Sequence, residues 1–590
     1  MHSSIEILTT PRRDDLDLLR IANGSGLSVS VLPTGAIFAI EHVQANRRIV
    51  INQTLALPIG NGMARLYLRV GGPRPTILPV MGPESPLLVG ALDDRYVWEG
   101  EQSGVGHRVT LWLHPRLNAW FWRVEVVNRR DEELSCDAVL IQDLGLGDQG
   151  FLMNNEAYAS QYLDHHVAAH PRLNHVLMGR QNLSQGGVYP WAAHGCLEGA
   201  AGYATDFRQV MGPAYRDADQ LDVPFGTNLP SERLQYETAC AALQSKAVTL
   251  EPGGKASWTF FGFFQPDHPA ASSEADVSRI DAVEGASRDW REREIALSAP
   301  PRSLLHDSRS AVSETLDDKA VRARYRRRTH VEKAGDQLLS FFVPGRTHSR
   351  HVVLRAKEHI VARRHGSLVR SGQELLPDET ILCATAWMHG VFGAQLTIGN
   401  TSFHKLFSVS RDPYNITRAS GLRILMETKD GWRLLTVPSA FEMGLSDCRW
   451  IYRLAGRTAT VSATVSGEEP AMQWRVTVEG PRCRFLVFGH LVLGEQEFAH
   501  AGRVEIDSKR KRLTFRPDLN DRWGQQYPEA VYRLVTSTPG RIEAIGGDEL
   551  LYADGKRRSG AFVAIRTKTT SDFVFAVVGS MTDPKKADAL

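Results

Sequence analysis

Apolar and polar residues alternate along most of this chain, in short segments that end at turn residues. The alternation is clear in residues 27–31, 109–113 and 122–126. A period of two places one set of side chains on a buried face and the other toward water, as in strands of antiparallel sheets. Residues 504–515 predict a hairpin with a charged tip. The pattern therefore predicts an all-β fold built from large sandwiches.

Four short motifs occur twice, in the same order and at nearly the same offset. Residues 35–38, 95–98, 122–124 and 146–149 are echoed by residues 390–392, 449–452, 474–476 and 493–496. Each match alone carries no weight, but four matches in order indicate a duplicated domain. A chain of 590 residues is also too long for one hydrophobic core.

The segment between the two copies has a different pattern. Val277, Ile280, Val283 and Trp290 have helical spacing with charged residues around them, and Pro300 and Pro301 must interrupt any helix there. We therefore expect a first β-sandwich with a loop insertion at residues 1–270, a helical linker at 271–345 and a second β-sandwich at 346–590.

The first copy carries additional residues after position 147, which we expect to form loops where binding is commonly built. This region is rich in polar side chains: Asp143, Asp148, Asn154, Asn155, Glu156, Asp164, His165, His166, His170 and His175. Two carboxylates could serve as the acid and base of a glycosidase, although acidic residues in loops more often cap helices and form turns. The histidine spacing matches no metal-ligand pattern, so we expect no metal site.

A second polar stretch, residues 399–421, interleaves Asn, Ser, Arg and Tyr with aromatic residues. Sugar hydroxyls need hydrogen-bond donors and acceptors, while the pyranose faces stack on aromatic rings. Arg411, Tyr414 and Asn415 are the candidate substrate-binding residues. The alternative is a long connection held in place by its own side chains.

Composition narrows the range of partners. The chain has 69 basic and 67 acidic residues, so it has no overall field that would attract nucleic acid or an anionic membrane. The basic run at residues 322–328 could contact phosphate, but a solvated helix face is the interpretation we favour. Residues 145–150 spell GxGxxG, but the residues that follow do not predict a nucleotide-binding helix, so we reject a dinucleotide fingerprint. We expect a neutral or small partner and no cofactor.

The cysteines and the N-terminus indicate the compartment. Six scattered cysteines form no CxxC pair and predict reduced core thiols. The first residues lack a basic segment followed by an apolar one, and no apolar run approaches the roughly 20 residues that cross a bilayer. We expect a soluble cytoplasmic protein.

Several of these segments resemble the β-sandwich region of bacterial β-1,2-oligoglucan phosphorylases, in the cellobiose phosphorylase family. The same region resembles the phosphorylase-like part of cyclic β-1,2-glucan synthases. In the second copy the resemblance lies in residues 387–402, Arg411, Asn415, 420–423, 434–444 and 449–450. In the first copy it lies in residues 32–37, 52–53, 66–69 and 155–161. The resemblance implies two antiparallel supersandwiches of galactose mutarotase-like type.

The resemblance also implies a helical (α/α) barrel, which in that family holds the general-acid aspartate and the site for inorganic phosphate, the co-substrate. This sequence has no run of helices after the second copy, so we expect no barrel in it and carry over no catalytic residue. The first hypothesis is a non-catalytic sandwich half that binds β-glucan or scaffolds a separately encoded barrel. The others are a self-sufficient hydrolase, lyase or epimerase using residues 143–175, and a homodimerisation scaffold.

Overall fold

The computed structural model describes residues 5–72, 74–155, 157–218, 228–373, 381–396, 404–409, 412–558 and 560–588. The chain forms two compact units. The first sandwich comprises Asp17–Gly212 and Leu221–Arg302. The second sandwich comprises Met1–Leu16, Pro213–Gln220 and Ser303–Leu590. The boundaries expected from sequence stay a prediction, and the contact-based units differ from them because two short segments pack with the second sandwich.

The first sandwich contains three antiparallel sheets around one core. Its largest sheet has the order β13 (Leu163–His170), β14 (Asn174–Gln181), β15 (Trp191–Cys196), β19 (Lys255–Gln265), β11 (Ala119–Asn128), β10 (Val105–Leu113), β9 (Arg95–Gln102) and β8 (Leu87–Leu92). A second sheet has the order β16 (Ala200–Asp206), β17 (Ala239–Ser245), β12 (Leu134–Asp143), β6 (Arg65–Val70) and β7 (Thr76–Pro79), and β18 (Val248–Leu250) pairs with β12. The third has the order β2 (Leu19–Ala22), β3 (Leu27–Val31), β4 (Ile37–Gln44) and β5 (Arg47–Val50).

Alternation along the strands builds this core. Trp98, Trp122, Val124 and Trp258 lie on one face of the eight-stranded sheet and are fully or almost fully buried. They pack with side chains of the two smaller sheets. The predicted strands at 27–31, 109–113 and 122–126 are confirmed as parts of β3, β10 and β11.

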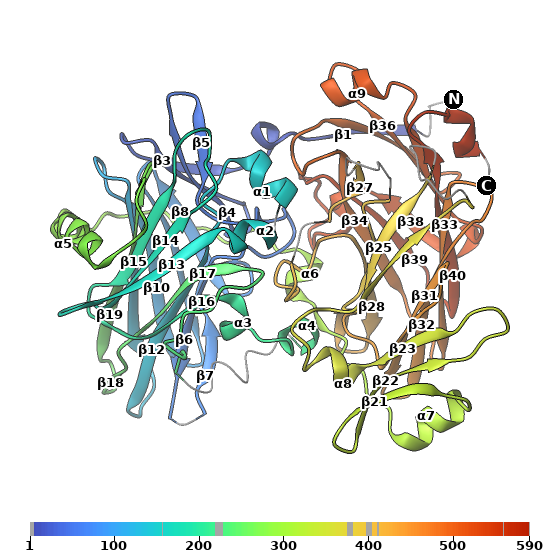
Figure 1. The fold of residues 1–590 in the computed structure, drawn as a ribbon, viewed down its shortest axis with the longest axis horizontal. Coiled ribbons are helices and arrows are strands. Elements are labelled where there is room, and N and C mark those ends of the chain that lie inside the picture. The colour runs from blue at the N-terminus through green and yellow to red at the C-terminus, as the bar shows by residue number, and fades with distance from the viewer. Residues whose placement is uncertain are drawn as a thin grey trace. The chain divides into compact units, whose positions relative to one another are not determined.

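The outer face of the same sheet carries its own helix. Helix α5 (Ile280–Ser287) follows the 3-10 turn η2 (Glu274–Arg279) and lies beside β15 and β19 in Figure 1. Its apolar residues Ile280, Val283 and Ala286 pack on Trp112, Phe121 and other outer-face side chains. The helical spacing is thereby confirmed for Ile280 and Val283, whereas Val277 lies in the 3-10 turn and Trp290 follows the helix. The chain then runs back along the edge strand, where Ser298 and Val89 exchange backbone hydrogen bonds of 2.8 and 2.9 Å.

The second sandwich is built in the same way. Its twelve-stranded sheet has the order β1 (Ile5–Thr10), β35 (Gly502–Asp507), β36 (Arg512–Pro517), β37 (Val531–Val535), β40 (Asp572–Ser580), β33 (Ala471–Glu479), β32 (Arg457–Val465), β31 (Asp447–Leu454), β30 (Ala440–Met443), β23 (Arg350–Leu354), β22 (Gln337–Val343) and β21 (Thr329–Ala334). The predicted hairpin at 504–515 is confirmed by β35 and β36.

The facing sheet has the order β24 (Gly366–Arg370), β25 (Cys383–Trp387), β26 (Val391–Ala394), β28 (Leu422–Thr428), β34 (Phe485–Gly494), β39 (Phe562–Thr567) and β38 (Ile542–Gly546). Strand β27 (Lys405–Phe407) pairs with β34, and β29 (Gly431–Leu434) pairs with β28 and with β20 (Arg309–Ser310). Trp450, Trp474 and Phe575 are among the buried side chains between the sheets.

Matching strand orders confirm the duplication. The order β13-β14-β15-β19-β11-β10-β9 in the first sandwich corresponds to β35-β36-β37-β40-β33-β32-β31 in the second. Backbone conformations match as well. Gly35 and Gly390 have φ of 84° and 85°, and Leu146 and Leu493 both have φ of 51°. A left-handed leucine is uncommon, so its recurrence at matched positions points to inherited backbone geometry.

The remaining helices are short. They are η1 (Arg13–Asp15), α1 (Gln149–Asn155), α2 (Ala157–Gln161), α3 (Phe207–Val210), α4 (Tyr215–Ala218), α6 (Leu304–Asp307), α7 (Asp318–Arg324), α8 (Arg355–Glu358), α9 (Arg522–Gln526), η3 (Pro539–Arg541), η4 (Asp548–Leu550) and η5 (Pro584–Asp588). Within the described ranges, no helix has the length and apolar character needed to cross a membrane.

Two expectations about the chain between the motifs differ from the structure. The range expected as a helical linker contains strands β21 and β22, which extend the twelve-stranded sheet, because residues 337–343 form an apolar strand. The region after position 147, expected as inserted loops, forms strands β13 to β16, which have counterparts in the second copy. Between β16 and β17 the first copy adds α3 and α4.

Candidate functional site

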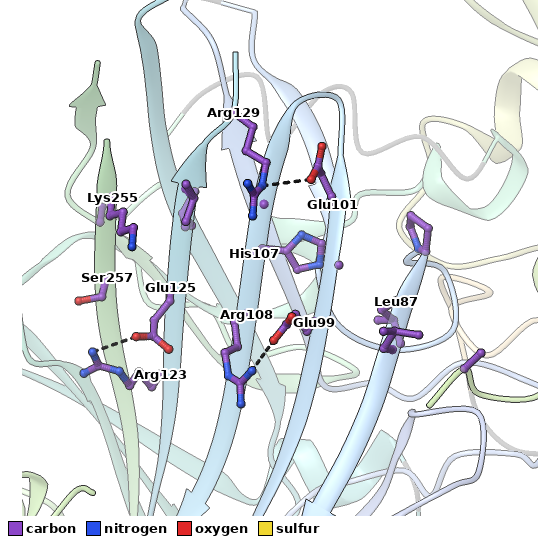
Figure 2. Close-up of a pocket in the computed structure, with 18 of the residues that line it drawn as sticks. Leu87, Glu99, Glu101, His107, Arg108, Arg123, Glu125, Arg129, Lys255 and Ser257 are labelled. Atoms are coloured by element: carbon purple, nitrogen blue, oxygen red, sulfur yellow. Dashed lines mark hydrogen bonds and ion pairs between the residues drawn. The ribbon is translucent and has the colours of Figure 1, made fainter. Parts of the chain in front are cut away.

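A long open groove lies on the outer face of the eight-stranded sheet of the first sandwich. Its volume is about 1050 Å³, just above the range of about 300–1,000 Å³ for small-molecule sites. Strands β8, β9, β10, β11 and β19 form its floor, and residues 299–302 contribute to its rim. Figure 2 shows polar side chains rising from these strands. We call this feature the groove.

Strand register places the groove's charged residues in one row. Arg108 is paired with Glu99 on β9 and with Glu125 on β11, and Glu125 is in turn paired with Ser257 on β19. Directly paired residues of antiparallel strands point to the same face. Their neighbours along the strands, Trp98 and Trp258, point into the core, so this row faces outward.

Ion pairs order the groove's side chains, as the dashed lines of Figure 2 show. Arg108 pairs with Glu99, Arg123 Nη2 lies 3.1 Å from Glu125 Oε1, and Arg129 Nε lies 3.1 Å from Glu101 Oε2. These pairs are partly exposed, so each adds little to stability. Their value here is geometric, because they present fixed donors and acceptors with nearly balanced charge. Such a surface suits a neutral ligand rich in hydroxyl groups.

Glycines allow other side chains to lie close over the sheet. A Cβ on Gly100 would meet the Pro86 carbonyl oxygen at 2.4 Å and the His107 ring at 3.1 Å. A Cβ on Gly106 would meet Arg129 Nε at 3.0 Å. His107 alternates with Arg108 along β10, so it lies on the core side of the sheet and is buried. Burial lowers the pKa of His107 to about 4, so its ring is neutral near pH 7.

The residues predicted to bind substrate lie elsewhere, in the second sandwich. Arg411 is outside the described residues. Tyr414 is 1% exposed and Asn415 is 3% exposed. The Asn415 amide donates to the Arg216 carbonyl at 3.2 Å and accepts from Arg423 Nη1 at 2.9 Å. The small cavity beside Asn415 has a volume of about 20 Å³, which is room for about one water molecule. Substrate binding by these residues stays a prediction.

The acidic and histidine-rich region is largely occupied by internal contacts. Asp143 ends β12 and is 1% exposed, and its Oδ2 accepts from the Gln53 and Thr54 amides at 2.8 and 2.9 Å. Burial raises the pKa of Asp143 to about 7, against the lowering effect of those amides. Glu156 lies outside the described residues. This arrangement provides a buried structural carboxyl group and does not present Asp143 to a sugar.

The histidines of this region have separate environments. His165 is buried, which lowers its pKa to about 4. His166 faces Glu274 at 3.3 Å, His170 Nδ1 accepts from two backbone amides, and His175 packs on the Tyr203 ring. Across the described part of the chain, no group of three or more His, Cys, Asp or Glu residues is arranged to hold a metal ion.

Sequence reasoning missed the groove residues, although part of the signal was visible. Polar residues occupy every second position in β9, β11 and β19, as Glu99 and Glu101, Arg123 and Glu125, and Lys255 and Ser257 show. That alternation indicates one polar face for each strand. The pairing of β11 with β19 joins residues more than 120 positions apart, and the sequence alone does not give that neighbour.

Two family models match the two halves of the chain. The model of the SOGP N-terminal domain matches residues 30–262, and the model of the glycoside phosphorylase supersandwich domain matches residues 325–579. The chain therefore carries the paired sandwich domains of the glycoside phosphorylases.

A curated relative narrows the resemblance within that class. The 1,2-beta-oligoglucan phosphorylase of Listeria innocua is 29% identical to this chain over 523 residues, which make up 88% of this chain and 46% of that protein. The chain thus spans about half the length of that relative. The expected resemblance to the β-1,2-oligoglucan phosphorylases is confirmed.

Similarity to solved structures is weaker. A polysaccharide lyase is 8% identical with a TM-score of 0.28, covering 78% of this chain and 45% of its own. A galactose mutarotase related enzyme from Lactobacillus acidophilus is 11% identical with a TM-score of 0.22, covering 43% and 100%. A bacterial glucoamylase is 10% identical with a TM-score of 0.26, covering 48% and 38%. The sheets and the two family models define the fold as a pair of antiparallel β-sandwich domains.

Proposed function

We propose that this chain is the sandwich half of a β-1,2-oligoglucan phosphorylase-like system, and that it binds β-linked gluco-oligosaccharide through the groove. The observation that carries the proposal is that two glycoside phosphorylase domain models match this chain, one over each of its two sandwiches. A partner polypeptide with an (α/α) barrel would supply the phosphate site and the general acid, and inorganic phosphate would be the co-substrate. No cofactor is required.

Three structural observations support the proposal. The groove offers space, ordered donors and acceptors, and nearly balanced charge for a neutral oligosaccharide. Helices among the described residues are no longer than the eight residues of α5, and none belongs to a barrel. All six cysteines are free and buried, which confirms the expected core thiols and supports the proposal that the protein works in the reducing cytoplasm.

Binding is tested by titrating the full chain with sophorotriose in a calorimeter. Arg123→Ala removes a groove guanidinium, and we expect it to weaken binding about tenfold, the size of one lost charge-assisted hydrogen bond. Arg475 occupies the matching position of the second copy on β33 and is exposed, so Arg475→Ala is the matched control and should bind as the native chain does. Equal losses in both variants would contradict the groove assignment.

Catalysis is tested by measuring glucose 1-phosphate release from sophoro-oligosaccharides and phosphate. The proposal expects no release by the purified chain alone, and release once an (α/α)-barrel partner is added. Turnover by the chain alone would refute the non-catalytic assignment. If turnover were then lost on changing Asp148 or Asp164 to Asn, the self-sufficient enzyme would be the correct interpretation.

A further inference from the structure

A second cavity lies on the same outer face, at the C-terminal end of α5. Its volume is about 200 Å³, below the range of about 300–1,000 Å³ for drug-sized ligands, so it suits a single ring rather than a chain. Its lining combines aromatic rings with hydroxyl and guanidinium groups: Trp112, Phe121, Arg123, Leu197, Thr259, Ser287 and Trp290.

The aromatic wall of this cavity is ordered by packing. The Trp112 ring stacks on Phe121 with centroids 5.1 Å apart, and Trp290 meets Trp112 edge-on at 5.7 Å. Trp290 follows α5, and its amide lies 3.4 Å from the Ser287 carbonyl oxygen. It is only partly buried. Trp112 and Phe121 are buried and hold the wall in place, and a fixed, partly exposed indole such as that of Trp290 is a surface on which the C–H face of a pyranose packs.

Polar groups line the same space. Arg123 Nη2 donates to Glu125, while the buried Arg123 Nε has no hydrogen-bond partner within the described residues. Ser287 Oγ donates to the Glu284 carbonyl at 2.7 Å, so its oxygen can accept a bond from a ligand hydroxyl.

The local charge argues against a cationic ligand. The guanidinium carbons of Arg95 and Arg123 lie 4.7 and 5.7 Å from the centroid of the Trp290 ring. An aromatic cage for an ammonium group would place carboxylates and bare rings there instead. A neutral ring with C–H faces and hydroxyl edges fits the lining better.

The second cavity and the groove lie next to each other along the same strands of the sheet. The row Arg108–Glu125–Ser257 is followed along the same strands by Thr110–Arg123–Thr259 and then by Trp112–Phe121–Phe261. Arg123 lines both the groove and the second cavity. The outer face therefore changes from charged to aromatic within two steps along each strand, with Arg123 at the junction.

We propose that the second cavity is a pyranose subsite, in which Trp290 packs on one glucosyl ring of a chain that continues past Arg123 into the groove. This inference rests on the proposed glucan-binding function and adds the position and chemistry of one subsite. The ring stacks on Trp290, the Arg123 guanidinium donates to a ring hydroxyl, and the remaining residues of the oligosaccharide lie along the charged row.

The test uses the full chain with two probes, methyl β-D-glucoside for one ring and sophorotriose for the chain. Trp290→Ala should raise the dissociation constant of both about tenfold, and Trp290→Phe, which keeps an aromatic face, should raise it less. Trp432 is a matched control, because it is also partly buried and has the Arg484 guanidinium carbon 5.8 Å from its ring. Trp432→Ala should bind both probes as the native chain does.

Each outcome has one meaning. If the native chain binds sophorotriose and Trp290→Ala binds it equally well, the subsite is overturned while glucan binding stands. If the native chain binds neither probe, the binding part of the proposed function fails as well. If adenosine, a flat aromatic ligand, binds at Trp290 and methyl β-D-glucoside does not, the cavity is not a pyranose subsite. Thermal unfolding of each variant shows whether it is folded. If Trp290→Ala does not fold, the binding of Trp290→Phe is compared with that of the native chain instead.

Discussion

At the residue scale, Asp143 is a carboxyl group buried among backbone amides. Its pKa of about 7 lies above the usual value near 4, because burial disfavours the charged form. Between pH 4 and 7 the unfolded chain has released this proton and the folded chain retains it. The contribution of Asp143 to the free energy of unfolding is therefore complete below about pH 4. It falls as the pH rises from 4 to 7 and is constant above pH 7, with a total change of at most about 4 kcal/mol.

Asp143→Asn should remove this pH dependence, because the amide oxygen can still accept from Gln53 and Thr54 while nothing titrates. We expect the variant to gain stability relative to the native chain when the pH is raised from 5 to 8, as measured by urea unfolding midpoints. Asp206 behaves in the same direction, with a pKa raised by burial to about 7, so Asp206→Asn is a second instance. If the stability difference between Asp143→Asn and the native chain were the same at pH 5 and pH 8, Asp143 would be ionised in the folded chain over this whole range.

Matched glycines provide a comparison between the two copies. Gly35 and Gly390 share a left-handed backbone, so alanine is strained at both, by about 1–2 kcal/mol. Their surroundings differ. A Cβ on Gly35 would have its closest contact with Trp98 Nε1 at 3.2 Å, whereas a Cβ on Gly390 would lie 2.0 Å from the Leu435 carbonyl oxygen.

Gly390→Ala should therefore destabilise the protein more than Gly35→Ala. Both substitutions strain the local backbone, but the alanine at position 390 also requires the Leu435 backbone to move. Thermal unfolding followed by tryptophan fluorescence should show the larger decrease in midpoint for Gly390→Ala. Equal decreases would mean that backbone strain alone sets the cost and that the contact with Leu435 relaxes freely.

At the element scale, α4 shows how a four-residue helix can be firmly held. Arg216 is fully buried, and its guanidinium donates to the carbonyls of Pro413, at 2.6 Å, and of Val361, at 3.1 Å, with the Glu358 carboxylate 3.7 Å away. Asp217, also fully buried, accepts from His359 at 2.7 Å. All of these residues belong to the second sandwich.

Arg216→Ala should cost about 3–5 kcal/mol of unfolding free energy, because it removes a cation beside the buried Glu358 carboxylate and leaves the Pro413 and Val361 carbonyls without this donor. The control is Arg322→Ala on α7, where the ion pair with Asp318 is exposed and is worth about 0.5 kcal/mol or less. Urea denaturation of both variants gives the comparison. A loss below 1 kcal/mol for Arg216→Ala would mean that water replaces the guanidinium at little cost.

Elements that are marked by the alternation and turn residues of their own segment could be predicted from the sequence. Features that depend on strand pairing between distant segments could not. The hairpin at residues 504–515 and the strand at 122–126 followed from alternation and turn chemistry. Strand β21, from Thr329 to Ala334, is exposed along its whole length, so it lacks the apolar alternation that would reveal a strand. The groove was missed because its row of charges is assembled by pairing between strands far apart in sequence.

At the scale of the whole molecule, the chain order does not follow the order of the two sandwiches. Residues before Leu16 belong to the second sandwich, although residues 17–212 that follow them form the first. Strand β1 pairs with β35 in six consecutive register positions, from Ile5 with Asp507 to Thr10 with Gly502. The twelve-stranded sheet therefore receives its edge strand from the opposite end of the sequence, as Figure 1 shows.

Removing residues 1–11 should expose the edge of β35 and leave the first sandwich intact. We expect faster amide hydrogen exchange in residues 502–507 and unchanged exchange in β3, because β1 pairs with β35 and with no strand of the first sandwich among the described residues. Thr10→Val is a smaller change that removes the hydroxyl accepting the Gly502 amide at 2.6 Å. It should raise exchange at Gly502 alone. Faster exchange in β3 after the deletion would show that the N-terminal strand also supports the first sandwich.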